Sequence, residues 1–429
     1  MRNYTMKNLY TQGQYEDAIA YATDSEVRNG FTEWDYLFLS KCLYKLKRYS
    51  EYLELYKEFH EKFPDSDKLD DNMGWSLYHI HVRNFDFETG DRRQYLRQID
   101  YILSHSTDSK YSPKVWVAKF AADAVFKNKL SVNPNYELGN KYLSVVDPLS
   151  LELTEHENTV DGRTMKTASD REKWYNRKTK ALVELQLYDE CLSCIDDAFQ
   201  NVDHFHNNCN HWLNYRKAQC LSGLGDLDGA EKTIKDILGR FEHWCFYELL
   251  FNIAVARGNT EEAIRYGAIG ALVDREHKLR VSFYENYAEF LLHNGYPREA
   301  ALHYKLVEQI RFEEGWKGIR LPEEFSYPED VWSLDTKDVI KELLPFWRQE
   351  KERGIEFYEG TIDRILPNGK SGFIRDDNGN SYYFNVRDFT RRVNELQEGA
   401  RVRYTLEERL DKSKNVMKQN AVQISFIRR

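Results

Sequence analysis

The sequence has little of what β-rich, secreted or membrane-spanning proteins need. Its 429 residues hold only nine Pro and 22 Gly, too few for an all-β protein with many tight turns. Six Cys in a chain of this length do not make a disulfide framework. No run approaches the about 18–20 apolar residues that span a bilayer, and the first ten residues lack the apolar core of a secretory signal. We therefore expect a cytoplasmic protein with reduced thiols and no membrane partner.

Positive charge is also not in excess. The chain has 61 Lys and Arg against 70 Asp and Glu, a net charge of −9, which argues against a protein that coats DNA or RNA along its whole length. Hydrophobic residues make up 41% and charged residues 31%, so a packed core is feasible and wholesale disorder is not. Aromatic residues reach 14%, which indicates cores or grooves built from rings. The length indicates two or three domains.

Common catalytic motifs are missing as well. The sequence contains no Gly-rich phosphate loop of the G-x-x-x-x-G-K-[ST] type, no H-E-x-x-H and no G-x-S-x-G. We therefore predict a protein that is not an enzyme and needs no cofactor.

One phrase recurs along the first three quarters of the chain. A helical pattern ends, a Gly or polar residue follows, and an acidic residue then precedes a small or apolar one. Copies of this phrase begin at Gly13, Lys47, Gln186, Gly225, Gly258 and Gly295. The step from Tyr15 to Tyr49 is 34 residues, and the step from Leu227 to Thr260 is 33.

A period near 34 with helix–turn–helix units resembles the tetratricopeptide repeat. Gly suits the tight turn because a positive φ costs it least, and the acidic residue favours the positive end of the second helix. The resemblance covers residues 1–320 and is weak between about 65 and 165, where the pattern is irregular. It implies an all-α solenoid that binds a protein or peptide in its groove. Nine rings lie on the expected first helices, and the sequence does not separate groove from core: Trp34, Tyr36, Trp75, Tyr78, Trp212, Tyr215, Tyr247, Tyr284 and Tyr287.

The character of the chain changes twice after residue 320. Residues 321–354 begin with Pro-containing turns and continue as a short helix from about Thr336 to Arg353, interrupted by Pro345, which we interpret as a capping helix and linker. From residue 355 to 429 the apolar period becomes two. Five short strands are expected there, which suits a small Greek-key β-barrel.

The residues of this last segment resemble a cold-shock domain, an OB-type barrel. The resemblance rests on Gly360-Thr361-Ile362, on the run 368–374, on Asp376-Asp377-Asn378-Gly379, on the run 383–386 and on the run 396–402. Cold-shock domains bind single-stranded RNA or DNA by stacking bases on rings, with Lys and Arg contacting the backbone. The expected partners are therefore single-stranded nucleic acid, with RNA favoured, and an unidentified protein in the helical groove.

This sequence departs from the cold-shock pattern at three places. The first-strand Trp platform is absent, since Asp363, Arg364 and Ile365 occupy those positions. One ring of the first RNP-type motif has become Ser371, and Asn385 replaces the usual His of the second. If Ile374, Tyr382, Phe384 and Val386 point into the barrel, then Phe373, Tyr383 and Asn385 point out together. The resemblance and this alternation give the candidate nucleic-acid-binding residues Arg364, Lys370, Phe373, Arg375, Tyr383, Asn385 and Arg387.

The charge is divided unevenly along the chain. Residues 355–429 carry 14 Lys and Arg against 11 Asp and Glu, a net charge of +3, which leaves −12 for the remainder. Such asymmetry favours an appended nucleic-acid-binding module. The basic residues near the end are Lys412, Lys414, Lys418, Arg428 and Arg429, for which a solvated loop and terminus is the plain alternative.

A Cys-x-x-Cys at Cys191 and Cys194 stands near His204, His206, Cys209 and His211, a set that in principle contains four zinc ligands. However, Cys191 occupies the small-residue position of a repeat helix, where a thiol usually packs in the core. We therefore predict no metal site.

The sequence thus predicts a non-catalytic adaptor: a tetratricopeptide-like solenoid (1–320), a capping helix and linker (321–354) and a cold-shock-like barrel (355–429). The combination also resembles accessory proteins of bacterial conflict or anti-phage systems. One alternative is a pure protein scaffold whose barrel binds no nucleic acid, and another is an enzyme whose site one sequence does not reveal.

Overall fold

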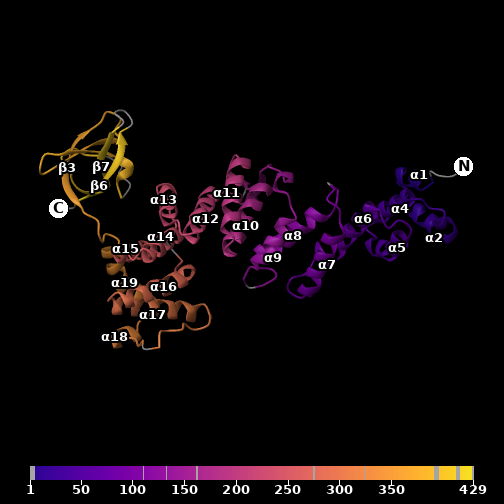
Figure 1. Cartoon of the computed structure of the whole chain (residues 1–429), viewed down its shortest axis with the longest axis horizontal. Coiled ribbons are helices and arrows are strands. Elements are labelled where there is room, and N and C mark those ends of the chain that lie inside the picture. Colours follow the sequence, from indigo (N-terminus) through magenta and orange to yellow (C-terminus); the bar gives the residue numbers. More distant parts are fainter. Residues whose placement is uncertain are drawn as a thin grey trace. The chain divides into compact units, whose positions relative to one another are not determined.

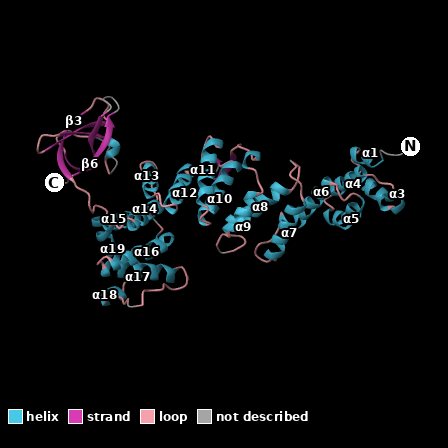
Figure 2. Ribbon diagram, in the orientation of Figure 1, coloured by secondary structure: helices cyan, strands magenta, loops and turns pink. Residues whose placement is uncertain are grey.

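The structure is a computed structural model that describes residues 5–109, 111–131, 133–160, 163–273, 276–323, 325–390, 396–411 and 416–427. The described residues form mostly helices, followed by a small barrel of strands (Figures 1 and 2). By internal contacts the chain divides into two compact units, Met1–Glu242 and His243–Arg429. The fold class expected from the sequence, tetratricopeptide-like helices followed by a closed five-stranded barrel, is confirmed.

The first unit holds thirteen of the α-helices among the described residues. They are α1 (Thr5–Thr11), α2 (Tyr15–Thr23), α3 (Ser25–Asn29), α4 (Glu33–Lys45), α5 (Tyr49–Lys62), α6 (Asp67–Leu77), α7 (Arg92–His105), α8 (Lys114–Phe126), α9 (Tyr136–Ser144), α10 (Asp170–Glu184), α11 (Tyr188–Asn201), α12 (Cys209–Gly223) and α13 (Leu227–Leu238). Neighbouring helices pack in pairs, as helical repeats do.

The second unit continues with helices and ends with the barrel. Its helices are α14 (Trp244–Ala256), α15 (Thr260–Leu272), α16 (Val281–His293), α17 (Pro297–Glu313), α18 (Glu329–Trp332) and α19 (Thr336–Glu350). The α19 helix runs without a break past Pro345, where an interruption was expected, and Gly354 follows it with a φ of +69°. It packs against α15 and α17, and its Trp347 donates a hydrogen bond of 2.9 Å to Nε2 of the buried His303.

A left-handed turn residue separates the two helices at each of the six predicted repeat copies. The φ angles lie between +58° and +89° at Gly13, Lys47, Gln186, Gly225, Gly258 and Gly295. After the turn, Asp226 and Asn259 cap the second helix by accepting hydrogen bonds from backbone N–H groups. The small-residue position that follows is fully buried, as Cys191 and Ala230 show. The sequence phrase is therefore the local code for one helix pair.

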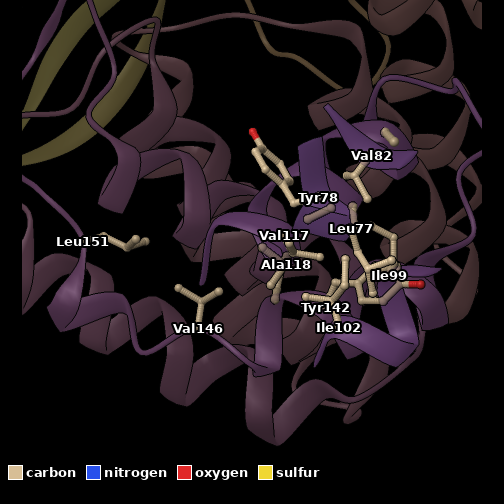
Figure 3. Packing of buried hydrophobic residues seen from close by; sticks show 14 of the residues in the cluster. Leu77, Tyr78, Val82, Ile99, Ile102, Val117, Ala118, Tyr142, Val146 and Leu151 are labelled. Carbon is tan, nitrogen blue, oxygen red and sulfur yellow. The ribbon is translucent and has the colours of Figure 1, made fainter. Parts of the chain in front are cut away.

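The region between about 65 and 165 departs from this repeat, as its sequence indicates. A π-helical turn η1 (Tyr78–Val82) extends α6, and the 3-10 turn η2 (Pro148–Ser150) follows α9. Buried side chains of α6, η1, α7, α8 and α9 belong to one core (Figure 3). An antiparallel hairpin, β1 (His156–Val160) with β2 (Arg163–Thr167), was not predicted. Its only local signal is the Asp-Gly pair at 161–162, which favours a two-residue hairpin turn.

The barrel consists of β3 (Tyr358–Ile365), β4 (Ser371–Asp376), β5 (Ser381–Asn385), β6 (Arg401–Asp411) and β7 (Val416–Phe426). It closes in the order β3-β4-β5-β7-β6, and a parallel pairing between β5 and β7 completes the ring. Ile362, Ile374 and Phe384 are at most 1% exposed and fill the interior with residues of β6 and β7. Val386, expected in a strand, begins the 3-10 turn η4 (Val386–Asp388) instead.

Two of the six repeat turns use a residue other than Gly, which predicts a stabilising substitution. A residue with a side chain is destabilised by about 1–2 kcal/mol in the left-handed region. Gly avoids this steric strain, and its greater loss of chain entropy on folding costs only about 0.5–1 kcal/mol. We expect Gln186→Gly, at φ +58°, to raise the free energy of unfolding by about 0.5–1 kcal/mol. Urea unfolding followed by circular dichroism measures the shift. Gly225→Ala, at φ +89°, should move the midpoint in the opposite direction, and an unchanged midpoint for both variants would contradict the assignment.

Candidate nucleic-acid interface

A row of side chains crosses the outer face of the first three barrel strands. In the strand register Arg364 of β3 is opposite Phe373 of β4, and Phe373 is opposite Tyr383 of β5. The guanidinium carbon of Arg364 lies 5.1 Å from the centre of the Phe373 ring. The rings of Phe373 and Tyr383 meet edge to face, with centroids 5.8 Å apart. A cation and two rings from three successive strands therefore form one surface.

The alternation of each strand explains why this surface faces outward. Ile374 and Phe384 are fully buried in the barrel, so their neighbours Phe373 and Tyr383 lie on the opposite face. Tyr383 is 36% exposed, and Phe373 is half-buried between Arg364 and Tyr383. Tyr383 therefore offers the more accessible ring, and Phe373 also supports it from the side.

Seven of the eight basic side chains described in the barrel fall into two classes. Four arginines are paired with carboxylates within 3.0 Å: Arg375 with Asp363, Arg401 with Asp377 and Glu359, Arg403 with Glu352, and Arg409 with Asp388 and Glu407. The Arg401 guanidinium lowers the pKa of Asp377 below its usual range, as expected for a close ion pair. Within the described part of the barrel, Arg364, Lys370 and Arg387 have no carboxylate partner.

The other two cations without a carboxylate partner lie next to the ends of the strands that carry the rings. Lys370 projects from the turn between β3 and β4, where Gly369 has a φ of +62° and the Asn368 side chain accepts a hydrogen bond from the Lys370 N–H. Arg387 lies in η4, directly after β5. Both side chains are exposed and lie in segments that flank the strands carrying the rings. Cationic groups beside exposed rings suit a ligand that is both anionic and aromatic.

Two of the seven candidate residues are engaged within the barrel. A guanidinium nitrogen of Arg375 lies 2.9 Å from Asp363, so its charge is already compensated. The side-chain oxygen of Asn385 accepts a hydrogen bond of 3.0 Å from the Arg387 N–H, and Asp388 accepts one from the Asn385 N–H. These contacts cap η4 and hold Arg387 in place. The structure therefore brings Arg364, Phe373 and Tyr383 into direct contact and gives Asn385 a local structural partner.

Sequence reasoning did not include the fourth position of the same row. Asn420 of β7 is opposite Tyr383 through the parallel pairing that closes the barrel. Nothing local in the sequence around Asn420 signals this neighbour, because the pairing depends on closure between strands 37 residues apart. The basic residues Lys412, Lys414, Arg428 and Arg429, noted in the sequence, lie outside the described residues.

The cysteines and histidines around residue 200 are used in packing and hydrogen bonding. Cys191 and Cys220 are buried neighbours, and hydrogen bonding to Cys220 together with burial raises the pKa of the Cys191 thiol. His206 lies between two carboxylates, with Nδ1 2.8 Å from Glu172 and Nε2 3.2 Å from Glu155. These contacts join the β1–β2 hairpin segment to α10. Among the described residues no group of three or more His, Cys, Asp or Glu is arranged to hold a metal ion.

The rings on the helical repeats divide between core and surface. Tyr36, Tyr78, Tyr284 and Tyr287 are at most 5% exposed and belong to the core. Trp34 is 56% exposed, and the ammonium of Lys68 lies 4.3 Å from the centre of its ring. The sequence could not make this division, since all of these rings recur at helical spacing.

Comparisons with known proteins give likenesses only at the level of structure. No family model and no curated protein matches the sequence. A tetratricopeptide repeat protein from Parabacteroides merdae is 14% identical, covering 78% of this chain and 98% of its own, with a TM-score of 0.36. The human IFIT1 dimer with PPP-AAAA is 11% identical, covering 82% of this chain and 74% of its own, with a TM-score of 0.34.

A third solved structure, the C-terminal part of a repeat protein from Cytophaga hutchinsonii, is 13% identical. It covers 66% of this chain and 93% of its own, with a TM-score of 0.27. Scores this low have no bearing on function. No described helix combines the length and the apolar character that crossing a bilayer requires.

Close packing beneath the rings predicts a sensitive glycine. A Cβ at Gly372 would lie 2.4 Å from the Arg364 carbonyl oxygen and 2.9 Å from the Phe384 ring, and both distances are too short for a non-bonded contact. We expect Gly372→Ala to destabilise the barrel by about 1–3 kcal/mol, as overpacking does. Proteolysis that samples opening of the barrel measures the effect, and Ser381→Ala, at an exposed position of β5, is the matched control. Equal resistance of the two variants would contradict the close packing.

Proposed function

We propose that the protein is a non-catalytic adaptor whose barrel binds single-stranded nucleic acid, with RNA favoured. Phe373 and Tyr383 stack bases, while Arg364, Lys370 and Arg387 contact phosphates. The helical repeats recruit a protein partner through their groove. In this proposal residues 1–320 bind the protein partner, residues 321–354 cap the repeats and link them to the barrel, and residues 355–429 bind nucleic acid.

The strand arrangement supports this proposal. A closed five-stranded barrel in the order β3-β4-β5-β7-β6 is compatible with a Greek-key OB barrel, of which the cold-shock domain is one form. OB barrels bind oligonucleotides across the face of their second and third strands. The corresponding strands here are β4 and β5, which carry Phe373 and Tyr383.

The observation that carries the proposal is the distribution of charge around the rings. Four arginines of the barrel are neutralised by nearby carboxylates, but the described cations that flank the rings are not. No described carboxylate balances the charge of these cations, and a phosphate backbone with unstacked bases complements both the cations and the rings. A net charge of +3 for residues 355–429 also favours the binding of an anionic ligand.

A protein-only scaffold is the second candidate. It is favoured by the partial burial of Phe373, since a ring cluster that covers a barrel has the same geometry as a stacking platform. A cytoplasmic location and a role in a bacterial conflict or anti-phage system stay predictions from the sequence.

Replacing the exposed ring tests the stacking role. We expect Tyr383→Ala in the full chain to weaken binding of a labelled eight-nucleotide RNA by about 5- to 100-fold, since one stacked base contributes about 1–3 kcal/mol. Tyr383→Phe should bind almost as wild type because the ring face remains. Tyr111→Ala, at a ring 82% exposed on a helical-repeat loop, is the matched control in a fluorescence anisotropy titration. If the full chain binds neither RNA nor DNA at low salt, the nucleic-acid proposal is wrong and the protein-only scaffold is favoured.

Replacing an unpaired cation tests the phosphate contact separately. We expect Lys370→Gln to weaken binding about equally for all base sequences, because a phosphate contact carries no base information. It should also reduce the slope of log K against log salt by about 0.7, the value for one phosphate contact on a single strand. Lys317→Gln, an exposed lysine of the helical part, is the control. An unchanged slope for Lys370→Gln would exclude this phosphate contact.

A further inference from the structure

The row of outward side chains on the barrel does not end at the two rings. Arg364, Phe373, Tyr383 and Asn420 are successive partners across β3, β4, β5 and β7, and Asn420 is in turn opposite Glu407 of β6. Adjacent strands lie about 4.8 Å apart, so the row presents a cation, two rings, an amide and a carboxylate in even steps. Side chains of different chemical character therefore follow one another in a fixed order across the outer face of the barrel.

The amide of Asn420 faces the same side as the Tyr383 ring. Its neighbour Ala421 is 0% exposed and packs inside the barrel, so Asn420 lies on the outer face, where it is partly exposed. Gln423, with a φ of +50°, introduces an irregularity beyond this point, and the alternation from Asn420 to Ala421 precedes it. In the described structure no hydrogen bond to the Asn420 side chain is present. Its donor and acceptor are both available beside the ring.

On the far side of Asn420 the row ends in a cluster of charged side chains. Glu407 accepts a hydrogen bond of 2.7 Å from Arg409, and Arg409 is also 2.9 Å from Asp388. Lys418, two residues before Asn420 on β7, is opposite Arg409 in the strand register, so charges of both signs meet here. The row therefore runs from the cation Arg364 to this mixed cluster at Glu407, with about three positions between them.

We infer that Asn420 is a base-reading position, which hydrogen-bonds the edge of the base next to the one stacked on Tyr383. The inference rests on the proposed function and names the specificity of the same site. Rings accept every base, because every base has a π-face, so stacking on Phe373 and Tyr383 gives no sequence preference. An amide supplies one donor and one acceptor side by side, which match the N6 amino group and N7 of adenine. The barrel therefore selects a strand with adenine at one position and tolerates other bases at the two stacked positions.

The geometry favours Asn420 over three other amides of the barrel for this task. Asn385, the residue suggested by the family motif, has its side-chain oxygen occupied by the Arg387 N–H. The Asn368 side chain bonds to Ser371 and to the Lys370 N–H within its turn. The Asn380 side chain donates to Asp376 in the next turn. Asn420 combines an unoccupied amide with a position directly beside an accessible ring.

The test compares base preference in the full chain rather than affinity alone. Labelled eight-nucleotide strands of A and of U are titrated against wild type, Asn420→Ala and the neighbouring control Gln419→Ala. We expect wild type to bind the A strand more tightly, and Asn420→Ala to lose about 5- to 50-fold for the A strand with little change for the U strand. Gln419→Ala, at an exposed position on the adjacent step of β7, should keep the wild-type preference.

The outcomes separate this inference from the proposed function. If the full chain binds neither strand, the proposed function fails and the inference fails with it. If Tyr383→Ala weakens binding but Asn420→Ala leaves both strands unchanged, the site stands and base reading by Asn420 is wrong. An equal loss for both strands in Asn420→Ala would also overturn base reading, and its unfolding midpoint tells whether that loss is structural.

Discussion

Closure of the barrel is the constraint on which its outer face depends. Five strands share one interior, and the side chains that fill it, Ile362, Ile374 and Phe384 among them, fix the register of every strand. A shift of one residue in β4 or β5 would exchange Phe373 or Tyr383 with a core residue. The buried side chains therefore determine which rings meet outside, and no contact between the outer residues themselves is needed to align them.

Charge pairing then decides which outer residues remain available. Arg375 and Arg401 form ion pairs with carboxylates on neighbouring strands or turns. Each such pair offsets one positive charge on the outer surface of the barrel. Arg364 instead lies over the Phe373 ring, where the guanidinium keeps its charge and gains a cation–π contact. The net charge of a segment therefore says less about binding than the position of its unpaired cations. This is why −9 for the whole chain is compatible with an anion-binding face.

The helical repeats were predictable because their code is local. One turn residue, one acidic residue and one small residue recur together, and the structure uses them as a left-handed turn, a helix start and a buried contact. Lys47 and Gln186 show the limit of the pattern, since they adopt the same turn without being Gly. The sequence indicates that the region between about 65 and 165 is irregular, but it gives no short motif for the π-helical turn and only one dipeptide signal for the hairpin of β1 with β2. Likewise, the rings of the repeats were identified, whereas core and surface rings were not distinguished.

In the barrel, alternation predicted correctly that Phe373 and Tyr383 lie opposite the core residues Ile374 and Phe384. It gave no sign that Asn385 ends its strand, where its side chain caps the following turn. It also failed to include Asn420, whose neighbour Tyr383 is reached only through closure of the ring. Local patterns thus identify the strands that carry the proposed binding face, and long-range pairing adds Asn420 to it. In the proposed site, the base-reading residue therefore comes from the strand that closes the barrel, whereas the strands with locally recognisable patterns carry the rings.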